Sequence, residues 1–272
     1  DRVDNRPRPV GYTSNAQDYK PLSANVSLQY ANREPRFYAS VAFNGARWYL
    51  GNESQQANQN KQVFYYRGGG NGYSNNMFWL RTGIGVMKYV NPSDTYENSD
   101  GAKIIDKDEP AIRYADILLM YAEALNELTT SYEVSSWDGI KAYTINRDPE
   151  EMRKGIKPVR MRAGVPDYTD ETYNNRSDFR VKLKRERQIE LLGENSMRYF
   201  DLRRWKDAMV EENQLLQGCN INISDDEKRI ADFYKSTIIT SVHKVFEQRM
   251  YLWPFPTYEL KRNVNLTQNP GW

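Results

Sequence analysis

Aromatic side chains and polar amides are interspersed in one stretch of the sequence in a way that suits sugar binding. Between residues 44 and 108, eight Trp and Tyr rings lie among Asn, Gln and Arg: Trp48, Tyr49, Tyr65, Tyr66, Tyr73, Trp79, Tyr89 and Tyr96. Sugar rings have apolar C–H faces that stack on aromatic rings, while their hydroxyls bond to amide and guanidinium groups. The same rings could form the core of a small sheet, so composition leaves both interpretations open.

Other groups capable of chemistry are few. The chain has one Cys, expected in a polar turn at Cys219, and one His, expected at the surface at His243. These counts exclude a disulfide framework, a thiolate metal site and a multi-histidine metal centre. The glycine cluster at 68–72 lacks the following amphipathic helix that a phosphate loop requires. Adjacent acids such as Glu150 and Glu151 are typical of solvated helix starts. We therefore expect no catalytic residue, no metal site and no cofactor.

The composition describes a chain with balanced charge and many rings. Among 272 residues, 38 basic and 36 acidic side chains give a formal net charge of +2. Nucleic-acid binding is disfavoured because it needs an excess of Lys and Arg. Apolar residues make up 39% and aromatic residues 13% of the chain, so rings replace aliphatic side chains. No stretch approaches the ~18 consecutive apolar residues of a transmembrane helix.

The clearest expected helix covers residues 109–128. Asp108 is expected to cap it, and Pro110 falls in the first turn, where its missing N–H costs nothing. Small and large apolar residues share one stripe at helical spacing: Ala111, Ala115, Leu118, Ala122 and Leu125. Such a surface packs closely against partner helices. The sequence therefore predicts a helical scaffold.

The remaining elements are predicted with less regular patterns. Further helices are expected at 149–154, at 176–212 with a break at 193–196, and within 223–250. Residues 37–43 alternate as a strand does. The stretch 44–108 is expected to form Asn- and Gly-rich loops with short hairpin strands. The tail from residue 252 is expected to be irregular because it contains two prolines in close succession.

Residues 180–206 are rich in charges of both signs. Acids are interleaved with the basic residues at spacings that pair on a helix, for example Arg187 with Glu190. A nucleic-acid surface would be free of acids. The pattern therefore favours a helix face laced with salt bridges.

Four blocks of the sequence resemble one protein family. Residues 109–127 (EPAIRYADILLMYAEALNE) resemble the signature helix of the SusD/RagB family, and residues 185–205 (RERQIELLGEN, then RYFDLRRW) resemble its second block. Residues 251–272, with YLWPFP and NLTQNPGW, resemble the family's ending, and residues 33–38 (REPRFY) resemble the block that opens its C-terminal region. The blocks follow the family's order and span nearly the whole chain.

The resemblance implies a function and a location. Members of this family are Bacteroidetes lipoproteins on the outer face of the outer membrane, and they are not enzymes. They capture glycans and deliver them to a SusC-like TonB-dependent transporter. Their fold is mainly α, with a helical, tetratricopeptide-like scaffold and irregular, loop-rich segments that carry the ligand. The signature blocks are read as scaffold.

The chain is about half as long as usual members of this family, so we expect it to be the C-terminal portion of a longer protein whose lipid anchor precedes Asp1. Residues 1–108 are expected to form the loop-rich, ligand-binding region, and residues 109–272 the helical region with its extended tail. The residues favoured for glycan contact are Trp48, Tyr65, Tyr66, Arg67, Asn71 and Tyr73. Two alternatives remain: an interaction module that docks the transporter without binding sugar, and, disfavoured by the blocks, a glycoside hydrolase.

Overall fold

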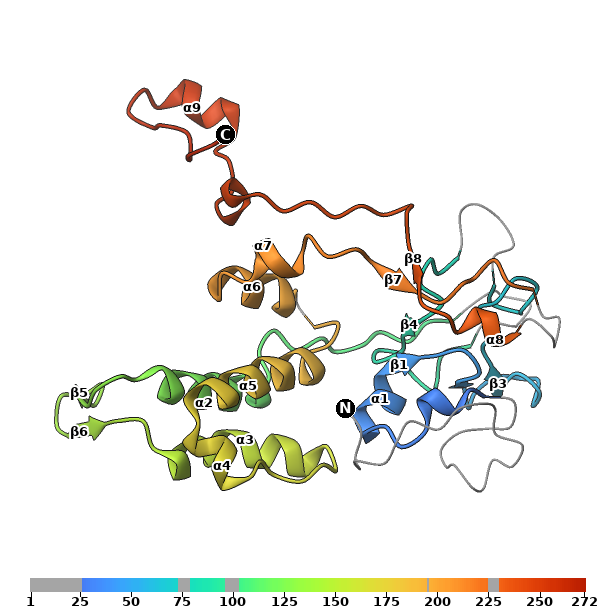
Figure 1. Cartoon of the computed structure of the whole chain (residues 1–272), viewed down its shortest axis with the longest axis horizontal. Helices are drawn as coiled ribbons and strands as arrows, with labels where there is room; N and C mark the ends of the chain where they lie inside the picture. The colour runs from blue at the N-terminus through green and yellow to red at the C-terminus, as the bar shows by residue number, and fades with distance from the viewer. Residues whose placement is uncertain (1–25, 73–78, 96–102, 195, 225–229) are drawn as a thin grey trace.

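The protein combines a helical part with a loop-rich part (Figure 1). The computed structural model describes residues 26–72, 79–95, 103–194, 196–224 and 230–272. Helices α2 to α5 lie side by side, and the short strands β1 to β4 gather in the other part (Figure 1). The expected fold class, a mainly α scaffold with irregular loops and short β-hairpins, is confirmed. Within the described ranges, every helix is too short or too polar to span a bilayer.

Helix α2 (Tyr114–Glu127) begins later than the sequence predicted. Asp108 does not cap it, and Pro110 lies outside it, because Arg113 holds the preceding chain in an extended conformation (φ −106°, ψ 149°). The Arg113 guanidinium reaches Glu194, with its Nε 2.7 Å from a carboxylate oxygen. The buried face is also rotated from the predicted stripe and consists of Asp116, Leu119, Ala122, Leu125 and Asn126.

Helix α3 (Pro149–Arg162) is longer than the short helix expected there. The Asp148 side chain caps it by accepting hydrogen bonds from the backbone N–H groups of Glu150 and Glu151. Helix α3 runs antiparallel to α2 (Figure 1). Gly155 permits their close approach, since a Cβ at this position would lie 2.4 Å from the carbonyl oxygen of Leu118.

Three further helices complete this part: α4 (Asp170–Asn174), α5 (Arg176–Glu190) and α6 (Met197–Arg204). The predicted break between α5 and α6 is confirmed, with left-handed backbone at Gly193 (φ 75°) and Ser196 (φ 55°). The one-turn helix α7 (Ala208–Glu211) follows. Helices α2 to α5 enclose an apolar cluster of Leu119, Ala122, Leu125, Met152, Ile156, Val159, Tyr173, Phe179 and Leu183.

The charges of α5 are paired, but not as the sequence predicted. Arg187 bonds to Asp116 (2.8 Å) and Asp201 (2.9 Å) instead of Glu190. Glu190 accepts from Arg36, Arg113 and Arg162, which come from three other segments. Arg187 and Glu190 are each only 3% exposed. The predicted helix-surface network is therefore a buried tertiary network, because its partners approach from distant parts of the chain.

The loop-rich part begins with a 3₁₀ turn, η1 (Leu28–Tyr30), and helix α1 (Pro35–Ser40). The predicted strand at 37–43 is wrong for most of its length, because Pro35 starts a helix there. The strands of the molecule form antiparallel pairs: β1 (Val41–Ala42) with β4 (Gly85–Val86), β2 (Arg47–Tyr49) with β3 (Asn60–Gln62), β5 (Tyr132–Ser135) with β6 (Ala142–Ile145), and β7 (Gln217–Gly218) with β8 (Thr237–Ile238).

The core of the loop-rich part is aromatic. Tyr30, Phe37 and Phe43 stack together, with ring centroids 4.5 to 5.9 Å apart. A later segment returns to complete this core and contributes Cys219, Ile221, Ile223 and Phe233. Cys219 is therefore a buried core thiol, which corrects the expected polar turn.

After α7, the described chain has few regular elements. Helix α8 (Ile230–Phe233) is a single turn where a longer helix was predicted, and β8 follows it in the β-branched stretch. His243 is exposed, as predicted. The tail contains a 3₁₀ turn, η2 (Gln248–Tyr251), and a short helix, α9 (Thr257–Arg262), which the sequence analysis did not predict.

Candidate functional site

The candidate site is built on the β2–β3 hairpin. In the antiparallel register Trp48 lies opposite Lys61, so both side chains project from the same face of the hairpin. Leu50 and Val63, two residues further along each strand, share that face and are buried. Tyr49 projects from the opposite face and is 58% exposed. The hairpin thus sets a ring and an ammonium side by side above an apolar floor.

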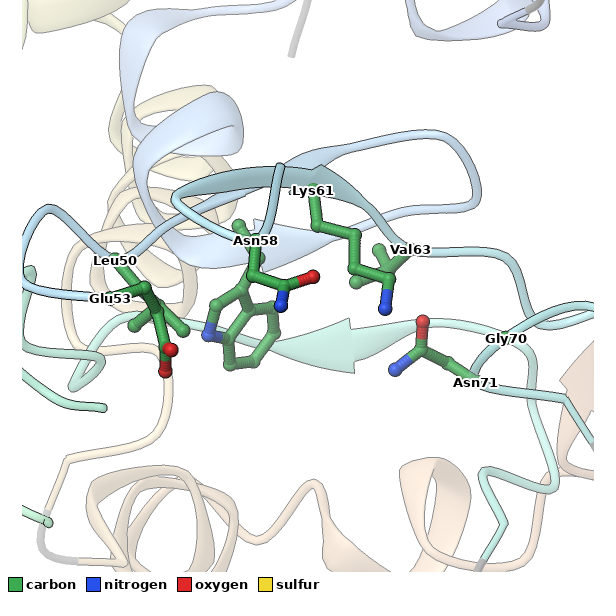
Figure 2. A pocket seen from close by; sticks show the side chains of 8 residues that line it. Leu50, Glu53, Asn58, Lys61, Val63, Gly70 and Asn71 are labelled. Atoms are coloured by element: carbon green, nitrogen blue, oxygen red, sulfur yellow. The ribbon is translucent and has the colours of Figure 1, made fainter. Parts of the chain in front are cut away.

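A cavity of about 370 Å³ lies on this face. Figure 2 shows it from close by, with Asn58, Lys61 and Asn71 directing their polar ends into the same space and Glu53 at the other end. Its lining consists of Trp48, Leu50, Glu53, Asn58, Lys61, Val63, Gly70 and Asn71. The volume falls within the range of small-ligand sites.

The loop between β2 and β3 positions Glu53 and Asn58. The Gln59 side-chain amide donates to the carbonyl oxygen of Glu53 (2.8 Å), and the Asn58 backbone N–H donates to Gln55 (2.8 Å). Gly51 is tied to a neighbouring loop through the carbonyl oxygen of Pro92 (2.7 Å). These bonds fold the loop over the cavity, and Glu53 is only 3% exposed.

The glycine cluster positions Asn71. The Asn71 backbone N–H donates to the carbonyl oxygen of Phe64 (3.0 Å), which folds the loop back on its own strand. Glycine is required because a Cβ at Gly69 would lie 2.6 Å from the same oxygen. Gly68 has a φ of +91°, a left-handed conformation that suits glycine. This cluster therefore serves close backbone packing rather than phosphate binding.

The cavity holds an arrangement of groups that suits a sugar. Trp48 supplies a ring, and its buried Nε1–H has no hydrogen-bond acceptor among the described residues. Asn58 and Asn71 bring amides that both donate and accept, Lys61 brings an ammonium, and Glu53 brings a carboxylate. An apolar ring face surrounded by convergent polar groups matches the apolar face and the hydroxyl edge of a sugar.

The structure brings together only some of the predicted site residues. Trp48 and Asn71 line the cavity. Tyr65 is 5% exposed in the aromatic core, and burial raises its pKa to about 12. Tyr66 is half-buried and packs edge-on against Phe233. Arg67 is exposed and its backbone N–H bonds to the carbonyl oxygen of Ile223, while Tyr73 lies outside the described residues.

Sequence reasoning missed three lining residues with polar side chains: Glu53, Asn58 and Lys61. Lys61 follows Gln59 and Asn60 in a polar stretch, so composition gave no reason to select it. The sequence offered one indication: Lys61 and Val63 are two residues apart, and residues two apart in a strand lie on the same face. Pairing this strand with Trp48 required the register, which the sequence did not show.

A second cavity of about 390 Å³ lies between α2, α5 and the end of α6. Its charges are already paired within the chain: Glu127 with Arg180, Glu123 with Arg204, and Lys184 with Asp207. Groups that satisfy one another have less to offer a ligand. We therefore take the cavity at Trp48 as the candidate site.

The chain is similar to known proteins along nearly its whole length. The model of a family described as the SusD family matches residues 6–272, which confirms the resemblance seen in the sequence. A sequence search of functionally curated proteins returned no match.

Solved structures share the fold. One is BT4246, with a TM-score of 0.73 and 25% identity, covering 93% of this chain and 40% of that chain. Another is BF3747, a SusD-like protein from Bacteroides fragilis, with a TM-score of 0.70 and 26% identity over 100% and 45% of the two chains. BF0978, a SusD-like carbohydrate binding protein from the same organism, has a TM-score of 0.59 and 24% identity over 89% and 42%, a likeness of fold alone. The chain thus spans less than half of each of these relatives.

Proposed function

Because the chain belongs to the SusD family, we propose that it binds glycans without altering them and that the cavity at Trp48 is the binding site. The observation that carries the proposal is the convergence of Trp48, Asn58 and Asn71 on one space of about 370 Å³. The ring supplies a stacking surface, and the two amides supply donors and acceptors for sugar hydroxyls. Residues 1–108 are then the ligand-binding region, and residues 109–272 include the helical scaffold.

We infer the place of this binding in the cell from the family. The full protein sits on the extracellular face of the outer membrane through an N-terminal lipid anchor and delivers its glycan to a SusC-like TonB-dependent transporter. BF0978, described as a SusD-like carbohydrate binding protein, shares the fold. No catalytic residue, metal or cofactor takes part in the function proposed.

Affinity gel electrophoresis on a panel of polysaccharides tests the binding site. Trp48→Ala removes the stacking ring, and we expect roughly 30-fold weaker binding, as for a buried aromatic anchor of an interface. Tyr49→Ala is the matched control, because its ring lies on the opposite face of the same strand. Tyr73→Ala tests the last predicted residue. Unchanged retardation of Trp48→Ala on every glycan that the wild type binds would remove the site.

A second function is favoured by the β5–β6 hairpin, which projects from the helical part (Figure 1). Trp137 in its turn is 98% exposed and Ile140 is 79% exposed. Apolar side chains exposed this far are typical of interaction surfaces. In this alternative the chain is a helical module that docks the transporter and binds no sugar. Copurification with a β-barrel partner, without retention on any polysaccharide, would favour it.

A further inference from the structure

Lys61 differs from most cations of the molecule. Its side chain is exposed at the cavity, and within the described ranges it makes no ion pair or hydrogen bond. Other basic residues of the molecule, such as Arg36, Arg113 and Arg187, bond to carboxylates instead. An ammonium set beside an aromatic ring without an anion is a group prepared for an anionic partner.

The two charges of the cavity lie apart. In Figure 2 the Lys61 amine points towards the Asn71 amide, and the Glu53 carboxylate lies at the opposite end. The cavity is therefore polarised: one end attracts an anion, and the end near Glu53 repels one. Trp48, opposite Lys61 in the hairpin, lines the same cavity.

We propose that this cavity selects acidic glycans, an inference that rests on the proposed function. A uronic acid residue would stack on Trp48, with its carboxylate at Lys61 and Asn71. Two neighbouring donors, an ammonium and an amide N–H, match the two oxygens of a carboxylate. The hydroxyl edge of the sugar then faces Glu53, which accepts hydrogen bonds from O–H groups. A sulfate ester on a sugar is also an anion. The experiment below therefore distinguishes glycans that carry carboxylates from glycans that carry sulfate esters.

The experiment compares acidic polysaccharides with their carboxyl-reduced forms. The probes are polygalacturonate, alginate, hyaluronan and glucuronoxylan, measured by affinity gel electrophoresis and isothermal titration calorimetry. At least one acidic polysaccharide should bind, and reducing its carboxyls should weaken binding about tenfold. Lys61→Gln should cause the same loss, Lys61→Arg should restore binding, and added salt should weaken only binding to the acidic form.

The control variant is Lys141→Gln. Lys141 is exposed in the β5–β6 turn and lies far along the chain from the residues of the cavity. Dextran sulfate and dextran form the sulfate arm. Retention of dextran sulfate that both lysine variants reduce equally would indicate ion exchange at the surface and would overturn the proposal. Loss of dextran sulfate binding in Lys61→Gln alone, without binding to any uronate, would assign the site to sulfate esters and overturn the uronate assignment.

The outcomes separate the two proposals. Binding of neutral glycans that depends on Trp48 but not on Lys61 would overturn the acidic selectivity and keep the proposed function. Absence of binding to every glycan would overturn both. Circular dichroism of Lys61→Gln confirms that the variant is folded, and we expect no change because the side chain makes no ion pair or hydrogen bond within the described chain.

Discussion

The buried charges of the helical part differ from Lys61 in the cavity of the loop-rich part. In the helices, Glu186, Arg187 and Glu190 are almost fully buried, and each has at least one partner of opposite sign. In the cavity, Lys61 is exposed and makes no ion pair among the described residues. The difference teaches which charges hold the fold and which are available for a ligand.

The same contrast extends to glycine. Gly155 lies where two helices meet, and a Cβ there would strike Leu118 and Ala122. Gly70 lines the cavity, and a Cβ there would meet nothing within 4 Å. Close packing therefore characterises the scaffold, whereas the cavity side of the glycine loop has space. Changes in the two parts should affect different quantities: stability in the first and binding in the second.

The largest expected effect is that of Arg187→Ala. The change leaves Asp116 without its partner and removes one of the cations on Asp201, and both acids are buried. Breaking a buried pair in this way costs about 3–5 kcal/mol of unfolding free energy. Urea denaturation measures it, with the exposed Arg185→Ala of the same helix as control. Equal losses in the two variants would contradict the contrast between buried and exposed charges.

Substitution of the two glycines should give the next effect. Gly155→Ala forces α2 and α3 apart and should cost about 1–3 kcal/mol, as for overpacked cores. Gly70→Ala should change the unfolding free energy by less than about 0.5 kcal/mol. The thermal midpoints of the two variants compare them directly. A loss in Gly70→Ala as large as that in Gly155→Ala would show that the loop is as tightly packed as the scaffold.

Acid should weaken the connection between the two parts at Glu194. Burial raises the pKa of Glu194, but hydrogen bonds from Arg113 and Lys88 outweigh it, so the pKa lies below its ordinary value. Because the pKa is lower in the folded state, the ionised carboxylate stabilises the fold above about pH 4.3 and this contribution is lost as pH falls through the folded-state pKa.

Glu194→Gln tests this pH dependence. The variant should be less stable than wild type by about 1 kcal/mol at pH 7, and the difference should shrink as pH falls below 4. Urea midpoints at pH 7, 5, 4 and 3 measure it. A difference that stays constant over this range would show that the charge of Glu194 does not contribute.

The smallest stability effect is expected at the cavity. Asn71→Ala removes an exposed amide whose side chain makes no hydrogen bond within the described chain, so the unfolding free energy should change by less than about 0.5 kcal/mol. Glycan binding should nevertheless weaken several-fold, because a donor to the ligand is lost. Calorimetric titration beside thermal unfolding separates the two quantities. If Asn71→Ala lost stability but kept its glycan binding, the contrast between a stabilising scaffold and a binding cavity would be contradicted.

The scaffold was predictable where local pattern decides structure. The break at Gly193 and Ser196 and the helices on either side of it follow from spacing and from glycine. The start of α2 could not be predicted from local pattern, because Arg113 is held by Glu194, which lies 81 residues further along the chain. The partner of Arg187 also comes from tertiary packing, which a helix-spacing rule does not include.

The candidate site was predictable only in part. Trp48 and Asn71 were selected for their chemical type, and the cavity contains both. Tyr65 has the same chemistry but lies inside the aromatic core, because the chain leaves β3 after Gln62 and the Tyr65 backbone N–H donates to the Asn44 side chain (2.7 Å). Lys61 could be assigned to the site only from the register that pairs β2 with β3.

The ion pair between Arg36 and Glu186 has a consequence for biogenesis. The two residues are 150 positions apart, and the aromatic core around Tyr30 is completed by Cys219 and Phe233. Contacts over such distances form late, because the intervening chain must first be present and closed into a loop. The helices between residues 114 and 190 can fold as soon as they are made. We therefore expect the aromatic core of the loop-rich part to form last, after these helices have folded.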